Sequence, residues 1–405
     1  MRRNIVICLA AACLLWANSV VLAAAAPPIA PSSSAPSPSA PSPTSSGKSP
    51  DAPDPHPPRG GIGPNGRPVG GPRLLSRGLI VPAGAPALPA GLTAQGWVLA
   101  DLDSGAILAA RDPHGRYQPA SVLKTLTSVT LLPLLPGERV VTVSPSAARA
   151  EGSAAGLVGG GTYTVDQLFS GLLLVSGNDT AQALAEAAGG SQHTVDLMNA
   201  QALRLGAYDT YVQTPSGLDG WQQLTSAYDL ALVLRAAVNQ PRLVTYDRQA
   251  EATLPVQPIN GYSPVTLQNQ NEQFLTTVPG ALLAKTGFTD AAQHTFLGAI
   301  ARHGRRLGVI FLRAQRYPTD QWQQATALMD WGFALPAATP AVGHLDAAVH
   351  LPPQAVSAHP VAAVEADHRV SSASDALLVA LLVLGAFGTA GVAGWWIGAR
   401  QHRRS

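Results

Sequence analysis

The sequence predicts an α+β domain in which an antiparallel sheet lies against a cluster of helices. Strand-like segments occur near both ends of the central region, and the segments between them carry helical periodicity. Outside this region the chain is rich in proline, serine, alanine and glycine and has few large apolar side chains. These observations indicate one globular domain over residues 75–335, long enough to bury a single core.

Two segments outside the domain are predicted to engage a membrane. Residues 1–26 have the form of a secretory signal peptide, with basic residues, an apolar run and small residues at its end; an uncleaved signal anchor is the alternative. Residues 376–397 contain no charge and are long enough for a transmembrane helix. Because residues 398–405 are basic, they are expected to form a cytoplasmic tail. We therefore expect a single-pass cell-membrane protein whose domain lies on the extracytoplasmic side.

The composition excludes several kinds of partner and cofactor. Residues 27–74 and 336–375 are expected to be linkers, since they offer too little apolar surface to offset the entropy of ordering. Only 12% of residues are charged and the net charge is +2, so a nucleic-acid partner is not expected. Both cysteines, Cys8 and Cys13, lie in the leader, and no His-Glu-x-x-His motif occurs. No metal and no cofactor are therefore expected.

The first elements of the domain are a hairpin and a helix. Residues 97–101 and 107–110 are short apolar runs separated by Leu-Asp-Ser-Gly, which is typical of a β-hairpin. Residues 120–132 are predicted to be helical, with Pro119 just before the first turn, where its missing N–H costs least. Apolar residues at helical spacing predict three further helices, over residues 164–175, 179–188 and 226–238.

The last elements are two strands and a helix. Residues 295–301 and 307–312 are strand-like and are joined by a His-Gly-Arg turn. A final helix is predicted over residues 320–331, with Thr319 as its N-cap. Strands at both ends of the domain are expected to pair in one antiparallel sheet.

Ser121 and Lys124 form the first candidate catalytic motif. They are three residues apart on a predicted helix, so their side chains share one face. A serine hydroxyl needs a base to act as a nucleophile, and lysine supplies one only when it is neutral. A nearby cation such as Lys285 would lower the pKa of Lys124. Taken alone, the pair is more typical of an ordinary lysine one turn after a serine.

The second motif is Ser176-Gly177-Asn178, which interrupts an apolar helical pattern. The Ser176 hydroxyl could carry a proton between Lys124 and a departing amine, and the Asn178 amide could hold the substrate backbone. The alternative interpretation is a helix-capping turn, because these residue types are favoured caps. Both interpretations can hold together.

The third motif is Lys285-Thr286-Gly287, on a predicted edge strand. The Lys285 cation and Thr286 hydroxyl suit a substrate's terminal carboxylate, and Gly287 permits close approach of substrate backbone. The backbone N–H groups of Ser121 and Phe288 could together form an oxyanion hole. The alternative is an edge lysine that protects a surface strand from aggregation.

The three motifs follow one another at spacings of roughly fifty and then roughly a hundred residues, the signature of a serine acyl-transfer site without histidine. With these motifs the chain resembles the D-alanyl-D-alanine carboxypeptidases, which are low-molecular-mass penicillin-binding proteins. Four further stretches share this resemblance: residues 172–184, 214–219, 227–229 and 329–333. The resemblance covers nearly the whole predicted domain.

The resemblance implies a penicillin-binding-protein or β-lactamase-like transpeptidase fold. It also implies that Ser121 attacks the bond between two D-alanines at the end of a peptidoglycan stem peptide, and that water then hydrolyses the acyl-enzyme. β-Lactams are expected to acylate the same serine. The chain departs from the family pattern in two ways: Gln293 stands where glycine is common, and a β-rich C-terminal domain of some members is missing.

Three other functions remain open at the level of sequence. A β-lactamase of the same fold would need an added base, but none of Glu186, Glu251 and Glu272 has an asparagine four residues on. A D,D-endopeptidase would use the same residues as a carboxypeptidase. A catalytically silent wall-binding module is disfavoured, because such a module need not retain the motif serines and lysines.

Overall fold

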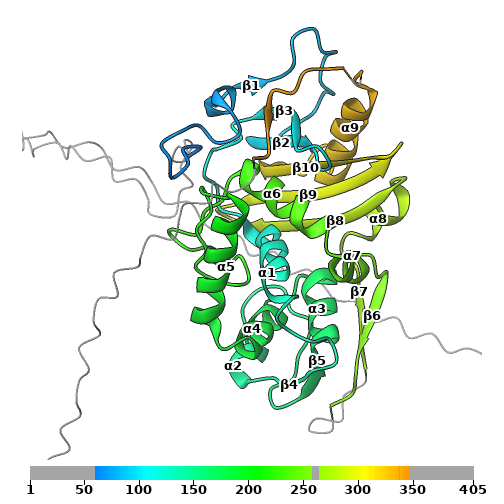
Figure 1. Ribbon diagram of the computed structural model, residues 1–405. Coiled ribbons are helices and arrows are strands. Elements are labelled where there is room, and N and C mark those ends of the chain that lie inside the picture. Colours follow the sequence, from blue (N-terminus) through cyan, green and yellow to red (C-terminus); the bar gives the residue numbers. More distant parts are fainter. Residues whose placement is uncertain (1–59, 258–263, 337, 347–405) are drawn as a thin grey trace, which may run out of the picture. The chain divides into compact units, whose positions relative to one another are not determined.

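The computed structural model describes residues 60–257, 264–336 and 338–346. Its centre is an antiparallel sheet in the order β1-β3-β2-β10-β9-β8, with β11 also paired to β3 (Figure 1). The strands are β1 (Leu79–Ile80), β2 (Gly96–Asp101), β3 (Ala106–Arg111), β8 (Ala281–Thr289), β9 (Gln293–Arg302), β10 (Arg305–Ala314) and β11 (Gly343–His344). Because β2 pairs with β10, the expectation that strands from the two ends of the domain pair is confirmed.

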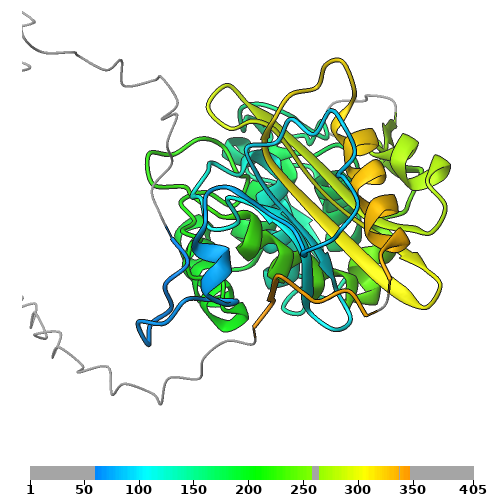
Figure 2. The same cartoon turned by 90° about the horizontal axis from the view of Figure 1, so that it is seen from above.

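Helices cover both faces of this sheet (Figure 2). Along β2, Trp97 and Leu99 belong to a buried cluster with α9 (Gln321–Ala334), whereas Val98 and Ala100 belong to a second cluster with α6 (Ala227–Val238). This alternation follows from the period of two in a strand, where successive side chains point to opposite faces. Apolar residues at every position of β2 therefore supply two cores at once.

The helical cluster lies beside the sheet and comes from the middle of the domain. Its helices are α1 (Lys124–Leu131), α2 (Pro145–Ala148), α3 (Val165–Leu174), α4 (Asn178–Ala187), α5 (Ser191–Leu205) and α7 (Pro241–Asp247). The short helix α8 (Glu272–Thr277) contacts β8 instead, and its Phe274 belongs to the same buried cluster as α9. Two small hairpins accompany the helices, β4 (Val140–Thr142) with β5 (Thr162–Thr164) and β6 (Glu251–Leu254) with β7 (Val265–Gln268). The α+β class predicted from the sequence is confirmed, and the helices predicted over 164–175, 179–188 and 226–238 are α3, α4 and α6.

Two predicted helix starts are wrong. The segment over 120–132 begins as a 3-10 turn, η2 (Ala120–Leu123), and becomes α-helical only at Lys124. The N-cap of α9 is Asp320 and not Thr319, because the Asp320 side chain accepts from the backbone N–H of Gln323, the third residue of the helix, while the Gln323 side chain accepts from the backbone N–H of Asp320. This reciprocal capping box satisfies two otherwise unpaired N–H groups.

Gln293, one of the two departures from the family pattern, has a left-handed backbone. Its φ is +56°, at the point where the turn from β8 enters β9. A side chain in this region clashes with the neighbouring carbonyl, and glycine adopts it without that penalty. The glycine expected here from the resemblance therefore has a conformational reason, and Gln293 bears a small local strain.

The described part of the domain extends beyond the predicted boundaries at both ends. On the N-terminal side it includes η1 (Pro72–Leu75) and a segment from Gly60, and on the C-terminal side it includes β11. His344 N donates to the carbonyl oxygen of Gly70 at 3.0 Å, so the two terminal segments bond to each other. Both segments are held by a polar network on α6.

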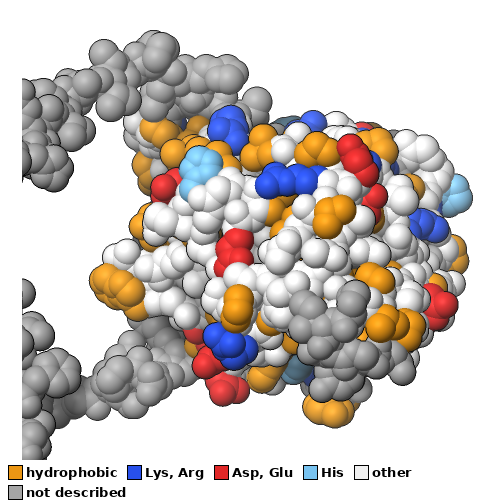
Figure 3. All heavy atoms as spheres, turned by 90° about the horizontal axis from the view of Figure 1, so that it is seen from below, with side chains coloured by type: hydrophobic (Ala, Val, Ile, Leu, Met, Phe, Trp, Pro, Cys, Tyr) orange, Lys and Arg blue, Asp and Glu red, His pale blue; other side chains and the backbone are white. Residues whose placement is uncertain are grey.

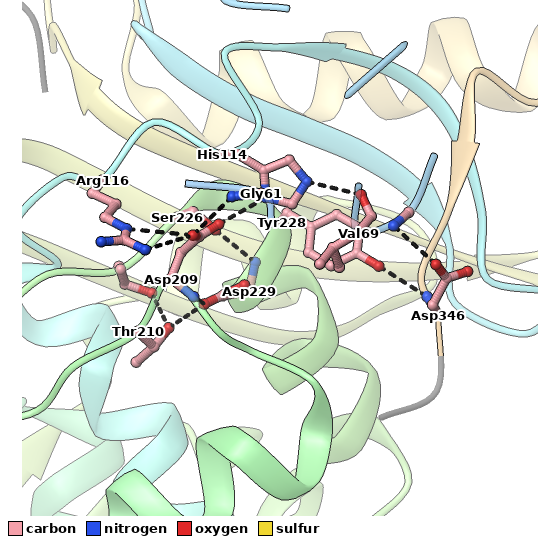
Figure 4. Close-up of polar contacts among 12 residues, drawn as sticks. Gly61, Val69, His114, Arg116, Asp209, Thr210, Ser226, Tyr228, Asp229 and Asp346 are labelled. Atoms are coloured by element: carbon pink, nitrogen blue, oxygen red, sulfur yellow. Dashed lines mark hydrogen bonds and ion pairs between the residues drawn. The ribbon is translucent and has the colours of Figure 1, made fainter. Parts of the chain in front are cut away.

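Figure 4 shows this network. His114 Nδ1 lies 2.7 Å from Asp209 Oδ2, and Gly61 N donates to Asp209 Oδ1 at 2.9 Å. Burial would raise the pKa of Asp209, but its contacts with His114, Gly61 and Arg116 lower it overall. Asp209 N in turn donates to Asp229 Oδ2 at 2.8 Å. A buried, paired carboxylate therefore joins the N-terminal segment to α6.

The C-terminal segment is held by Tyr228 of the same helix. The Tyr228 hydroxyl donates to the carbonyl oxygen of His344 at 3.0 Å and accepts from Asp346 N at 2.9 Å. Asp346 Oδ2 accepts from Gly70 N. The start and the end of the described chain are thus fastened to one helix.

The surface carries few charges. On the face shown in Figure 3, acidic and basic side chains are interspersed among polar and apolar ones. Within the described ranges, no helix combines the length and the apolar character that crossing a membrane requires. The predicted signal peptide over 1–26 and the predicted transmembrane helix over 376–397 lie outside these ranges.

We predict that Asp209→Asn lowers the free energy of unfolding by about 3 kcal/mol at neutral pH, since breaking a buried ion pair leaves a charge without its partner. The lowered pKa of Asp209 means that its stabilisation is present above the ordinary carboxyl pKa and is lost as the pH falls through the folded-state value. The difference from the unsubstituted protein should therefore shrink in acid. Denaturant titration at several pH values measures it.

The matched control is Asp330→Asn, which breaks the more exposed ion pair of Asp330 with Arg302. This change should cost less than about 1 kcal/mol. Equal effects of the two substitutions at neutral pH would contradict the structural role assigned to Asp209.

Candidate active site

Ser121 and Lys124 meet where η2 passes into α1. Lys124 Nζ lies 2.9 Å from Ser121 Oγ, 2.7 Å from Asn178 Oδ1 and 2.7 Å from the carbonyl oxygen of Ser216. The last two oxygens can only accept hydrogen bonds. A neutral amine has two N–H donors for them and one lone pair left, which then faces the Ser121 hydroxyl. The geometry suits Lys124 as the base for Ser121.

The surroundings of Lys124 favour this neutral form. The side chain is fully buried. Burial of the amine, followed by the charge of Lys285, holds the pKa of Lys124 well below its ordinary value of 10.5, while the charge of Asp179 acts in the opposite direction. Desolvation disfavours an ammonium and a like charge disfavours it further. Both effects make the amine available as a base near neutral pH.

Lys285 is buried as well, on β8. Its Nζ donates to the carbonyl oxygen of Thr286 at 2.9 Å. Burial lowers the pKa of Lys285 to about 8, and the charge of Asp247 opposes that change. The chain has only three lysines, and the two in the described ranges are both here. Since arginine does not lose its proton in proteins, only a lysine can be switched to a base by burial.

The second motif lies in the turn between α3 and α4. Ser176 has φ +60°, and its Oγ is buried without a hydrogen-bond partner among the described residues. Asn178 Oδ1 accepts from Lys124, and its Nδ2 donates to the carbonyl oxygen of Glu151. These contacts of the Asn178 amide orient Lys124, and the substrate contact expected from the sequence stays a prediction. The Ser176 hydroxyl is the free polar group of this motif.

Gly287 lies against the backbone of the nucleophile. β8 is the last strand of the sheet, as the sequence predicted, and contacts η2. A Cβ atom on Gly287 would come within 2.6 Å of Ser121 N and 2.5 Å of Thr295 Oγ1, so only glycine fits. Thr295 Oγ1 also donates to the carbonyl oxygen of Pro119 at 3.0 Å. The strand and the nucleophile turn are therefore held in close contact.

The free edge of β8 carries the expected oxyanion donor. Ala284 N donates away from β9, to Asp247 Oδ2 at 2.9 Å. In an antiparallel pair, backbone N–H groups alternate between the two edges of a strand. The N–H groups of Thr286 and Phe288 therefore share the free edge with Ala284. Ser121 N lies close to Gly287, the residue before Phe288.

The motifs open into one cleft with a volume of about 400 Å³. Its lining residues are Ser121, Ser153, Ser176, Gln270, Gln273, Thr286, Gly287, Phe288, His294, Arg316, Asp320, Gln321 and Trp322. Lys124, Asn178 and Lys285 lie behind this lining and are buried. Ser121, Ser176 and the last residues of β8 thus line the same space.

Several residues of the site are absent from the sequence prediction. Ser216 contributes a backbone carbonyl, and its sequence signal was its place in the 214–219 stretch. Arg316 and Asp320 form an ion pair on the cleft wall, with Arg316 Nε donating to Asp320 Oδ1 at 2.8 Å. His294 lies in the wall with its ring centroid 4.6 Å from that of Phe288. No local pattern marks these residues.

Known proteins are similar to this chain over the domain that contains the cleft. The family model described as D-alanyl-D-alanine carboxypeptidase matches residues 83–316. D-alanyl-D-alanine carboxypeptidase DacB2 of Mycobacterium tuberculosis is 42% identical over 261 residues, which are 63% of this chain and 87% of that protein. DacD of Escherichia coli is 31% identical, with 60% of this chain and 64% of that protein covered.

Solved structures share the fold. A crystal structure of D-alanyl-D-alanine carboxypeptidase from Mycobacterium tuberculosis H37Rv superposes with a TM-score of 0.61 at 41% identity, and covers 65% of this chain and 99% of that chain. The S216A mutant of the Streptomyces K15 DD-transpeptidase gives 0.58 at 25% identity, covering 61% of this chain and all of that one. The penicillin-binding-protein fold expected from the resemblance is confirmed. The chain belongs to the D-alanyl-D-alanine carboxypeptidase family of serine peptidases, the low-molecular-mass penicillin-binding proteins.

Proposed function

We propose that Ser121 is the nucleophile with which this D-alanyl-D-alanine carboxypeptidase removes the last D-alanine of a peptidoglycan stem peptide, and that neutral Lys124 is its base. The observation that carries this assignment is the 2.9 Å contact between Lys124 Nζ and Ser121 Oγ, made by an amine that is fully buried. Lys124 takes the hydroxyl proton while Ser121 Oγ forms a bond to the carbonyl carbon. The oxyanion that results is bound by the N–H groups of Ser121 and Phe288.

The leaving amine needs a proton, and Ser176 is placed to deliver it. Ser176 lines the cleft, and its buried hydroxyl has no partner among the described residues. The proton passes from Lys124 through Ser176 to the nitrogen as the C–N bond breaks, and free D-alanine leaves. Water then attacks the ester on Ser121 with Lys124 again as base, which releases the shortened peptide and restores the hydroxyl.

The substrate's terminal carboxylate binds beside β8. The Lys285 ammonium supplies the positive charge, and the Thr286 hydroxyl in the cleft lining supplies a hydrogen bond. A β-lactam carries a carboxylate and a strained amide in similar places, so it acylates Ser121 by the same step. The enzyme therefore binds penicillins as well as its peptide substrate.

The structure disfavours the rival β-lactamase function. Rapid hydrolysis of the acyl-enzyme would need a free carboxylate in the cleft. Glu186 instead accepts from Ser144 Oγ at 3.0 Å, and Glu251 accepts from Gln268 Nε2 at 3.0 Å. Neither lines the cleft, and the carboxylate that does, Asp320, is paired with Arg316. Slow release of penicillin is expected.

We further infer that the protein is a single-pass cell-membrane protein with its domain on the extracytoplasmic side. The apolar segment 376–397, the basic tail 398–405 and a peptidoglycan substrate support this inference. Removal of residues 376–405 should release active domain from the membrane fraction into the medium. If the shortened protein stays with the membrane, the anchor is elsewhere, and if the domain is found only inside the cell, the orientation is wrong.

We predict that Ser121→Ala abolishes both covalent labelling by fluorescent penicillin and release of D-alanine from a peptide that ends in two D-alanines. The loss should be at least about 10⁴-fold, because the nucleophile is removed. Ser146→Ala, at an exposed serine outside the cleft lining, is the matched control and should keep both activities. Retained labelling in Ser121→Ala would mean that another residue is the nucleophile.

A cross-linked peptide dimer added to the same assay separates the remaining activities. Release of D-alanine that is faster than cleavage of the dimer supports a carboxypeptidase, and the reverse order indicates an endopeptidase. Labelling followed by rapid loss of the label would indicate a β-lactamase.

A further inference from the structure

Asp247 is a buried carboxylate that the three motifs leave out. It is the last residue of α7, and only 1% of its surface is exposed. Its Oδ2 accepts from Ala284 N at 2.9 Å, immediately before the third motif. Its Oδ1 has no hydrogen-bond partner among the described residues. A buried carboxylate with an unpaired oxygen is costly, so a compensating charge is expected nearby.

Lys285 supplies that charge. The charges of Lys285 and Arg248 both stabilise ionised Asp247, but its burial outweighs them and raises its pKa to about 7. The effect is reciprocal. Burial lowers the pKa of Lys285, and the charge of Asp247, the carboxylate that acts on it within the described ranges, raises it. The Arg248 guanidinium is directed elsewhere, since it donates to the carbonyl oxygen of Ala281. Of the two cations, the charge of Lys285 therefore acts more strongly on Asp247.

Asp247 is also held firmly in place. Asn269 Nδ2 donates to its carbonyl oxygen at 2.7 Å and to the carbonyl oxygen of Gln249 at 2.8 Å. Asn269 Oδ1 accepts from Asn271 N at 2.8 Å. The end of α7 is thus fixed against the chain segment that leads into α8 and β8.

We propose that Asp247 is a positioning residue for the reaction, whose carboxylate holds the free edge of β8 at Ala284 and supplies the counter-charge that keeps Lys285 an ammonium. The proposal rests on the role given above to Lys285, which binds the substrate carboxylate and whose charge lowers the pKa of Lys124. Asp247 therefore has two functions. One of its oxygens holds β8 at Ala284, and its negative charge favours the protonated form of Lys285, the next residue of the strand.

The pH dependence of the site follows from this pair. As the pH rises through about 7, Asp247 ionises, and Lys285 keeps its proton until the pH passes about 8. Acylation requires charged Lys285 and neutral Lys124. The rate should therefore fall on the alkaline side as Lys285 loses its proton, and the position of this fall reports the charge on Asp247.

The test compares Asp247→Asn with the unsubstituted protein in the rate of acylation by fluorescent penicillin, from neutral to alkaline pH. Asparagine keeps an oxygen for Ala284 N–H and removes the charge. The alkaline fall in rate should move to lower pH by roughly one unit, as loss of a neighbouring opposite charge predicts. Asp247→Glu, which retains the charge, should keep the fall near its original position. Asp330→Asn, a change at a surface carboxylate, should leave the profile unchanged.

An unchanged alkaline fall in Asp247→Asn would overturn the proposal and leave Asp247 with only its contact to Ala284. This outcome is distinct from a failure of the proposed function, which would appear as absent acylation in the unsubstituted protein or as retained acylation in Ser121→Ala.

A second measurement covers the case in which the variants do not fold. In the unsubstituted protein, the ¹³C NMR signal of Lys285 Cε should show two inflections with pH, its own and a smaller one as Asp247 ionises. A single inflection would contradict the proposed coupling.

Discussion

Everything at this site depends on the burial of two lysine side chains close to each other. Burial removes the water that would stabilise either ammonium, and a like charge nearby lowers the pKa of an amine further. Both side chains are buried, and the charge of Lys285 helps to hold the pKa of Lys124 well below its ordinary value. The pKa of Lys285 falls only to about 8, because the charge of Asp247 opposes the effect of burial. The two lysines thus acquire different pKa values from their surroundings, which suits the proposed roles of one as a base and the other as a cation.

The fold creates this environment by bringing two of its parts together. The helical cluster supplies Lys124 and its two acceptors, and the last strand of the sheet supplies Lys285. Close backbone contacts fix the distance between these parts. Besides Gly287 against Ser121, a Cβ atom on Gly217 would lie 2.1 Å from the carbonyl oxygen of Ala120, whose own φ is +49°. Buried charges and left-handed residues lower stability, and the two cores on the faces of the sheet offset that cost.

Much of this architecture could be predicted from the sequence, for identifiable reasons. Short apolar runs revealed the strands at 97–101 and 307–312, and helical spacing revealed α3, α4 and α6, because these patterns are local. The motif serines and lysines were recognisable as a set in fixed order. What the sequence does not reveal is long-range pairing: no pattern near Asp247 shows that it meets Ala284, and none near Asn178 shows that Lys124 occupies its amide oxygen. The N-cap of α9 is also ambiguous in the sequence, because Thr319 and Asp320 are adjacent and both residue types are favoured N-caps.

The central claim is tested most directly by the pKa values of the lysines themselves. The chain has three lysines, so ¹³C NMR of labelled lysine Cε gives few signals, which single substitutions assign. Lys124 is expected to titrate well below 10.5 and Lys285 at about 8, and Lys285→Met is expected to move the titration of Lys124 to higher pH. A Lys124 that titrates at its ordinary value, or one that does not respond to Lys285→Met, would contradict the account.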